Sequence, residues 1–442
     1  MLSRPALALG LALLPGLATR ALAETLPVTL AQALELVDRQ SPDLAAVRER
    51  AAAQAAQAEA TGRAAWPRLS LSLDGFSTDN PARVFASKLN RGEFGEADFA
   101  VDRLNDPGSL SHLTTALSLE VPVDVFGRVK ERAASQDALA RAATAQGLEA
   151  AQQSRLQAAE AYQRAVLARE ALGVTRAALA GARAREADLG ARVQEGAALS
   201  ADLLRARARR RQREADLADR QGDLAIALAS LARILGAPDG TRYEPVEATA
   251  APGPLEGTLE EWQARALAAR GSLTGARERL AGTERARRTE EHSILPDLAL
   301  YGQLQDDRSF SGASGQSYAV GFSVRWNGFD PTRGKRVAAA ASQERAAALE
   351  ERAAAEQARL EVEIAWQRAS SARARHAAAA GGAEEGREAL RVVQERRKAG
   401  MATLTDELET EAASLAAQLE ELKAAADAAV ADAALKRAAG EL

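Results

Sequence analysis

The sequence predicts a mainly α-helical chain with a small β part, built as an internal duplication. Two long stretches, residues 123–237 and 332–442, contain no proline and are rich in Ala, Leu, Arg, Glu and Gln, which favour helices. Four short stretches alternate apolar and polar residues, as half-buried strands do. Landmarks of the first half recur in the second, for example Thr29-Leu30 and Thr258-Leu259. We therefore expect two copies of one structural unit.

The first 23 residues have the pattern of a secretory signal peptide. Arg4 gives a positive start, Ala6–Leu17 form an apolar stretch, and Ala21-Leu22-Ala23 is a typical cleavage site. We expect the chain to be exported. No later segment offers the roughly 18 uncharged apolar residues of a membrane-spanning helix. Entry into a membrane would therefore use β-strands.

The first repeat is expected over residues 24–257. Its proline-free stretch is interrupted once, where Gly196 ends one helix and Ser200 caps the next, which predicts a long helix and a shorter return helix. A Pro-rich segment at mid-length would lie on the outside. The elements expected are a helix over about 42–65, strands over about 68–76 and 113–123, helices over about 127–195 and 199–236, and this equatorial segment over 237–257.

The second repeat, residues 258–442, has the same plan. Here Gly400 ends the long helix and Thr403 caps the return helix. In both repeats the two shorter helices would stack end to end beside the long one. The elements expected are a helix over about 272–293, strands over about 297–305 and 317–327, and helices over about 334–399 and 402–440.

The alternating stretches are typical of membrane strands. In the clearest, residues 318–326, large apolar side chains alternate with small or polar ones. The four stretches hold or flank all eight phenylalanines, and each has about the 9–11 residues that a tilted strand needs to cross a bilayer. An ordinary hairpin with one face on a soluble core is the alternative.

Four strands cannot close a barrel, and an open sheet would leave unpaired backbone groups in lipid. A chain that inserts must therefore assemble with copies of itself. Two copies would give about 8 strands and three about 12, and the residues alone leave both numbers open.

Composition argues against enzymatic and nucleic-acid roles. With 57 Lys and Arg against 61 Asp and Glu, the net charge of −4 gives no support for polyanion binding. The absence of cysteine excludes disulfides, a thiol nucleophile, Cys-based zinc sites and lipoprotein acylation. The three histidines lie far apart, and no phosphate-binding loop or nucleophile elbow is present. We expect no catalytic or metal-binding residues, no cofactor and no nucleic-acid partner.

The mature chain carries an ordered set of short motifs. The motifs in the first repeat are LAQALEL over Leu30–Leu36, SPDL over Ser41–Leu44, Trp66-Pro67 before the first strand, and VPVDVFGR over Val121–Arg128 after the second. The two tip motifs are Gly196 followed by Asp202-Leu203-Leu204, and Gly400 followed by Asp406-Glu407-Leu408. Taken in order, these motifs resemble the TolC family of outer-membrane efflux proteins.

This resemblance implies a TolC-like homotrimer. Each copy would contribute 4 strands to a 12-stranded transmembrane β-barrel, which continues into a long α-helical tunnel across the periplasm. The implied partners are a periplasmic adaptor (membrane fusion) protein, an inner-membrane transporter and the outer-membrane lipid of a Gram-negative bacterium. The channel would be a passive exit duct in an efflux or secretion system.

The resemblance places a narrow aperture at the periplasmic tips. Asp406 and Glu409 match the family's paired acidic ring, which would select or gate ions. The alternative for Asp406 is a place in the first turn of a helix capped by Thr403. Asp202 occupies the equivalent place in the first repeat. The family's basic partner corresponds to Ala402, so the candidates to replace it are Arg397 and Arg192.

Two further sets of residues follow from the resemblance. The turns at the tips would dock the adaptor, although glycine-ended helix turns would explain the same residues. These docking residues are Gly196, Ala197, Leu199, Ala399, Gly400 and Met401. Aromatic side chains near the strand ends would form a belt at the membrane interface. These are Trp66, Phe76, Phe126, Tyr318, Trp326 and Phe329.

The main rival is a soluble periplasmic coiled-coil scaffold or adaptor protein. An adaptor usually has one helical hairpin between β-rich halves, whereas this chain has two hairpins in tandem, each with its own pair of strands. The transported substrate is not encoded in a recognisable way. Two methionines, three histidines and no cysteine provide no chain of soft-metal ligands, which disfavours a dedicated copper or silver channel.

Overall fold

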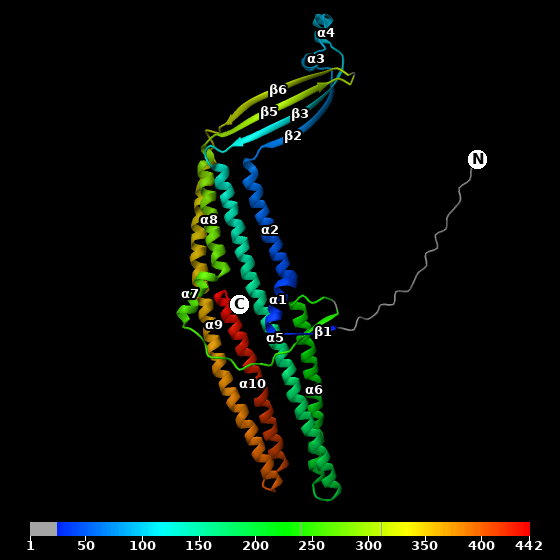
Figure 1. Cartoon of the computed structure of the whole chain (residues 1–442), viewed down its shortest axis with the longest axis vertical. Coiled ribbons are helices and arrows are strands. Elements are labelled where there is room, and N and C mark those ends of the chain that lie inside the picture. The colour runs from blue at the N-terminus through cyan, green and yellow to red at the C-terminus, as the bar shows by residue number, and fades with distance from the viewer. Residues whose placement is uncertain (1–23, 239, 311) are drawn as a thin grey trace, which may run out of the picture.

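The computed structural model describes residues 24–238, 240–310 and 312–442, so the expected signal peptide, residues 1–23, lies outside them. The molecule is elongated (Figure 1). A four-stranded sheet lies near one end, and long helices run from it to two tips at the other end (Figure 1). Within the described ranges, no helix is both long and apolar enough to cross a membrane.

The first repeat is built around one very long helix. Helices α1 (Leu30–Gln40) and α2 (Pro42–Gly62) both pack on α5 (Arg128–Gln194), and α6 (Ser200–Ile234) runs back along the other part of α5 (Figure 1). Ser41 separates α1 from α2, and its hydroxyl accepts a hydrogen bond from the Leu44 amide at 3.4 Å. The last residues of the expected helix 42–65 form a 3-10 turn, Arg63–Ala65.

The second repeat has the same order of elements. Its helices are α7 (Leu259–Ala269), α8 (Gly271–Glu291), α9 (Arg333–Lys398) and α10 (Leu404–Ala439), with a 3-10 turn over His292–Ile294.

The two short helices α1 and α7 are additions to the expected elements. Each begins with a capping box, in which a threonine and the side chain three residues later satisfy each other's amides. The pairs are Thr29 with Gln32 and Thr258 with Glu261. The sequence carried this signal at both places, so the duplication extends to the helix starts.

A small parallel sheet ties the start of the described chain to the equatorial segment. Strand β1 (Glu24–Val28) pairs with β4 (Thr241–Pro245) at mid-length. Beside it the buried Tyr162 of α5 donates a hydrogen bond to the Glu247 carboxylate at 2.9 Å. Burial, together with this carboxylate, raises the pKa of Tyr162 to about 12. This sheet was not predicted from the sequence.

Helix α5 is the spine of the molecule. It packs against α2 and α8 on the sheet side and against α6 and α10 on the tip side (Figure 1). Small residues allow close approach: a side chain on Gly271 of α8 would overlap the carbonyl oxygen of Ala145. The interfaces are accordingly rich in buried alanines, which explains why the helical part needs few aromatic residues.

The four long strands form one antiparallel sheet in the order β2-β3-β5-β6. The strands are β2 (Arg68–Thr78), β3 (Leu110–Val123), β5 (Asp297–Arg308) and β6 (Ser314–Arg325). Three strands extend further from the helices than the expected ranges, and β6 is shifted so that Trp326 follows it. The connection from β2 to β3 is long and contains α3 (Pro81–Asn90), a 3-10 turn (Glu96–Phe99) and α4 (Val101–Asn105).

Four charged side chains tie the helices together at mid-length. Arg270, which is 4% exposed, contacts Glu149 of α5 at 2.8 Å and Glu361 of α9 at 2.7 Å. Arg437 of α10 contacts the same two carboxylates at 3.1 and 2.9 Å. Burial opposes ionisation of Glu361, but a hydrogen bond from Gln357 and the arginine charges outweigh it and lower the pKa of Glu361.

We expect Arg270→Ala to destabilise the helical part strongly, because it leaves two carboxylates to share one arginine in a half-buried site. The cost should be about 3 kcal/mol, against less than about 1 kcal/mol for Arg164→Ala, an exposed arginine paired four residues away on one helix. Thermal melting of the helical circular dichroism signal in detergent measures both. Equal midpoints for the two variants would refute a structural role for this cluster.

Candidate functional site

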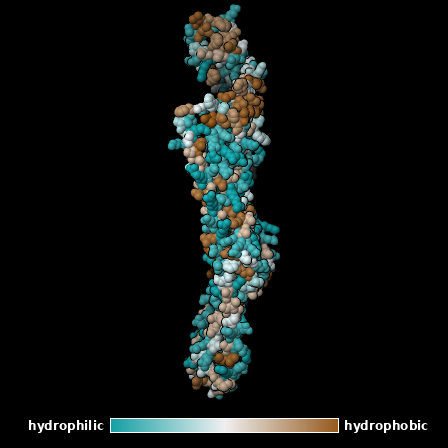
Figure 2. Space-filling model, turned by 90° about the vertical axis from the view of Figure 1, so that its left-hand side faces the viewer, coloured by the Kyte–Doolittle hydropathy of each residue, from teal (hydrophilic) through white to brown (hydrophobic). Residues whose placement is uncertain are grey.

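One face of the four-stranded sheet is apolar and exposed. A single row of cross-strand partners joins Leu71, Leu117, Leu304 and Tyr318, one from each strand. Leu71 is 71% exposed and Tyr318 is 79% exposed. Hydrophobic side chains gather over the sheet in the upper part of the molecule (Figure 2). A contiguous exposed apolar surface of this kind marks a membrane or protein contact.

The other face is polar. The neighbouring row joins Ser72, Ala116, Gln305 and Ser317 across the same four strands. In these two rows the register places apolar residues opposite apolar ones, and small or polar residues opposite one another, across all four strands. The alternation recognised in the sequence is therefore an alternation between two faces of one continuous sheet.

Five of the six predicted belt aromatics are exposed. Trp66, Phe126, Trp326 and Phe329 lie where the strands meet the helices, with exposed fractions of 42–88%. The Trp326 indole donates a hydrogen bond to the Ile294 carbonyl at 2.9 Å.

Phe76 is the exception, because it does not lie on the exposed apolar face of the sheet. Its position in β2 gives it the parity of Ser70 and Ser72, so it lies on the polar face, opposite His112. The two ring centroids are 5.1 Å apart.

The two tips have nearly the same backbone. Gly196 and Gly400 both have positive φ, 74° and 75°, which a side chain would disfavour. The following amides, of Ala197 and Met401, bond back to carbonyls five residues earlier at 2.7 and 2.8 Å. The six residues predicted to dock a partner are all exposed in the described structure.

The helix starts after the two tips differ. Thr403 caps α10 as expected. Ser200 does not cap α6: it is the first helical residue, and Leu199 occupies the cap position without a side-chain bond.

Asp406 belongs to the cap of α10. Its carboxylate accepts hydrogen bonds from the Thr403 amide at 2.8 Å and the Thr403 hydroxyl at 2.7 Å. These bonds lower the pKa of Asp406, so the exposed carboxylate stays charged at neutral pH. Glu409 is exposed on the same helix one turn later. Among the described residues, no group of three or more acidic or histidine side chains is placed to hold a metal ion.

The arginines considered as partners of Asp202 do not contact it. Asp202 lies 3.5 Å from Arg205 on its own helix. Arg192 pairs with Asp188 on α5 at 3.1 Å. Arg397 of α9 pairs instead with Glu407 of α10. Neither Arg397 nor Arg192 replaces the missing tip partner in this structure.

A buried link between the two helical hairpins near the tips was not predicted from the sequence. Arg185 of α5 contacts Glu407 at 3.2 Å and Glu411 at 2.5 Å, both on α10. The three side chains are only 6–12% exposed. Leu404 packs one turn closer to the tip, against Leu189 of α5 and Ala206 of α6. Residues 404, 407, 411 and 414 are spaced by three and four positions, so they lie on one face of the helix. This spacing was the signal in the sequence that could have predicted a buried face here.

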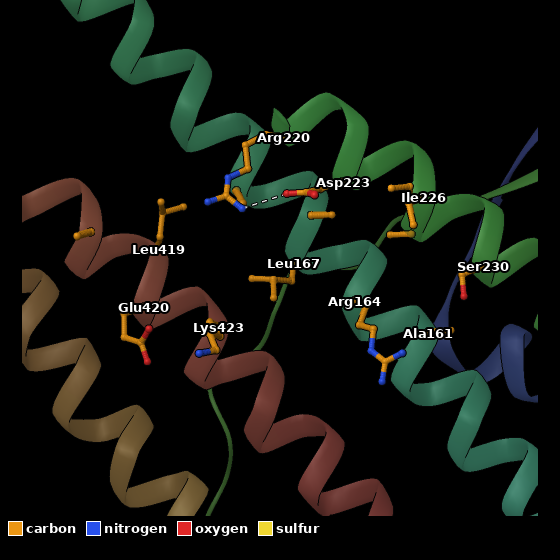
Figure 3. Close-up of a pocket in the computed structure, with 14 residues that line it drawn as sticks. Ala161, Arg164, Leu167, Arg220, Asp223, Ile226, Ser230, Leu419, Glu420 and Lys423 are labelled. Carbon is orange, nitrogen blue, oxygen red and sulfur yellow. Dashed lines mark hydrogen bonds and ion pairs between the residues drawn. The ribbon is translucent and has the colours of Figure 1, made fainter. Parts of the chain in front are cut away.

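A groove of about 650 Å³ lies over α5, between α6 and α10 (Figure 3). Leu167, Ile226 and Leu419 form its apolar part, and Ile226 is 71% exposed. Charged residues surround it, namely Arg164, Arg220, Asp223, Glu420 and Lys423. The groove uses Ala161, Arg164, Ala168 and Ala171 of α5, whereas the equatorial segment binds α5 through Tyr162, Arg169 and Glu170. The two therefore lie on different sides of that helix.

Several solved structures share this fold. The chain is similar to the outer membrane protein VceC from Vibrio cholerae, with 19% identity, a TM-score of 0.72, and 93% of this chain and 96% of that chain covered. It is also similar to the CmeC outer membrane channel of Campylobacter jejuni, with 16% identity, a TM-score of 0.73, and 93% and 85% covered. It is similar as well to the open state of the MtrE outer membrane channel of Neisseria gonorrhoeae, with 18% identity, a TM-score of 0.74, and 93% of this chain and 88% of that chain covered.

The family follows from a sequence model rather than from these distant structures. No curated protein matches the chain. The model described as outer membrane efflux protein matches residues 33–237 and 262–441, one segment in each repeat. This match confirms the resemblance drawn from the motifs and favours a channel over a soluble scaffold or an enzyme. The chain belongs to the outer membrane efflux protein family.

Proposed function

We propose that this outer-membrane efflux channel works as a homotrimer, in which three four-stranded sheets close one barrel and the helices form a tunnel below it. The observation that carries the proposal is the sheet itself. It has an exposed apolar face, a polar face and two edge strands, β2 and β6, without partners within the described chain. In lipid such edges must be paired.

The strand directions allow neighbouring copies to pair, and the volume of the barrel interior favours three copies. Successive strands alternate in direction, so β6 of one copy is antiparallel to β2 of the next and can pair with it. A barrel of about 8 strands is filled by its own side chains, whereas about 12 leave an open lumen. The apolar face then meets lipid, and the polar face lines the duct.

The tips form the periplasmic entrance in this proposal. Three copies bring Asp406 and Glu409 together as six carboxylates around one axis, which attract cations. The buried contacts of Arg185 with Glu407 and Glu411 fix α10, which carries the ring, against α5. The exposed turns at Gly196 and Gly400 dock a periplasmic adaptor, which joins the duct to an inner-membrane transporter.

The groove over α5 faces the lumen in the trimer. The equatorial segment lies on the outside, and the groove occupies a different side of the same helix. It offers passing cargo an apolar patch bordered by both charges (Figure 3). Transport through such a duct is passive, and energy is spent at the inner-membrane partner.

Adjacent residues on opposite faces of β6 test the membrane face. Val320 lies on the apolar face and is 80% exposed, and Ala319 lies on the polar face. We expect Val320→Arg to cost about 2–4 kcal/mol in the bilayer and to reduce the amount of protein in outer-membrane fractions. Ala319→Arg places its charge in the water of the duct and should leave the amount of protein in outer-membrane fractions unchanged. Equal losses in both variants would contradict the assignment of faces.

Asp406→Asn tests the acidic ring without breaking the cap, because the amide oxygen still accepts a bond from Thr403. We expect lower cation selectivity, measured as the reversal potential in planar bilayers under a salt gradient. Asp188→Asn removes an exposed carboxylate of α5 and should not shift the potential. An unchanged potential for Asp406→Asn would remove this residue from the selectivity filter.

Arg185→Ala tests the link between the hairpins. It leaves Glu407 and Glu411 buried with fewer partners, a cost of about 3–5 kcal/mol, so α10 should separate from α5 and widen the entrance. Single-channel conductance should rise. Arg192→Ala breaks only an exposed pair within α5 and serves as the control. A conductance equal to that of the control would show that this cluster does not hold the entrance.

A further inference from the structure

The connection between β2 and β3 is long, and the end of its helix α3 packs against the sheet. It spans residues 79–109, whereas β5 and β6 are joined by residues 309–313 only. One side of its helix α3 is buried: Val84 and Ser87 lie on it, and Arg91, which caps the end of the helix, continues the same spacing. The buried side of α3 must therefore lie against other parts of the chain.

Gly315 shows which face of the sheet α3 covers. This glycine is the partner of Asp307 in the ladder, so its missing side chain would point to the polar face. A Cβ atom built there would overlap the carbonyl oxygen of Asn90, the last residue of α3. The end of α3 therefore rests on the polar face of β6, at the end of the sheet far from the helices.

Arg91 anchors the same segment two strands away. Its guanidinium donates a hydrogen bond to the Ser111 carbonyl of β3 at 3.0 Å and contacts Glu93 at 2.6 Å. The Arg91 side chain is only 2% exposed. Because Gly315 belongs to β6 and Ser111 to β3, the end of α3 lies on one strand and the Arg91 side chain reaches another.

A polar pair is buried at this end of the sheet. His112 of β3 and Asp307 of β5 are 3% and 2% exposed, and the His112 Nε2 atom lies 2.9 Å from the Asp307 carboxylate. Thr114 and Gln305 donate hydrogen bonds to the same carboxylate at 2.7 and 2.9 Å. Elsewhere on this face, Ser70 and Ser72 are exposed. The burial of this pair is consistent with a segment that covers it. Because the Asp307 carboxylate has hydrogen-bond partners, it can be buried under that segment.

We infer that residues 79–109 form a constriction that sets the size limit of the outer mouth of the duct. The inference rests on the proposed trimeric barrel, in which the polar face lines the duct. A segment seated on that face occupies the interior, and three copies narrow the opening around the axis. The exit would then select cargo by size independently of the entrance at the tips.

Polymer exclusion from the outer side of single pores in planar bilayers tests this inference. Gly315→Ala should displace the end of α3 and shift the size limit for polyethylene glycol, added on the outer side, to larger polymers. Gly302→Ala is the matched control, because it also adds one methyl group to a strand glycine but meets nothing within 4 Å. The limit measured from the periplasmic side should not move in either variant.

Two more variants protect the test against misfolding. Arg91→Ala removes the second contact with the sheet. Replacement of residues 81–106 by a short Gly-Ser linker removes the segment itself. The sheet should tolerate this linker, because β5 and β6 are already joined by a short connection. A wild-type size limit in pores formed by the linker variant would overturn the inference. If the wild-type protein forms no pores, the proposed function fails instead, which is a different result.

Discussion

The two edge strands without partners, β2 and β6, constrain the whole molecule. In lipid their free backbone groups are too costly to leave unpaired, and the apolar side chains on one face are too costly to leave in water. A single chain satisfies neither requirement. In the proposed assembly lipid covers the apolar face and other copies continue the sheet, which explains why large apolar residues such as Val320 and Phe322 are exposed in one chain.

The helices extend this constraint along the molecule. Each hairpin begins where a strand ends, so in the proposed trimer the arrangement of copies around the barrel fixes the arrangement of helices below it. Helix α5 packs against helices of both repeats and extends from the sheet to the tips, so the orientation of the sheet determines where the tips lie. Alanine and glycine permit close helix packing, while buried charges at Arg270 and Arg185 fix the register between helices. Most of the few aromatic residues therefore lie in or beside the four-stranded sheet and not between the helices.

The sequence was sufficient for the main elements and insufficient for their long-range pairings. Proline-free stretches and alternation are local signals, so α5, α9 and the four strands were predictable. The pairing of β1 with β4 joins residues about two hundred positions apart and has no local signal. Arg185 is one of many arginines on the helices, and only the fold places it beside Glu407. Phe76 lies on the polar face, as its parity along β2 already indicated in the sequence.

The number of chains in the detergent-solubilised particle tests the central claim most directly. Native mass spectrometry of the mature protein extracted from outer membranes should give one species with the mass of three chains, since in the proposed trimer three sheets close one barrel. A stable monomer that needs no detergent, or a closed assembly of two chains, would contradict the account.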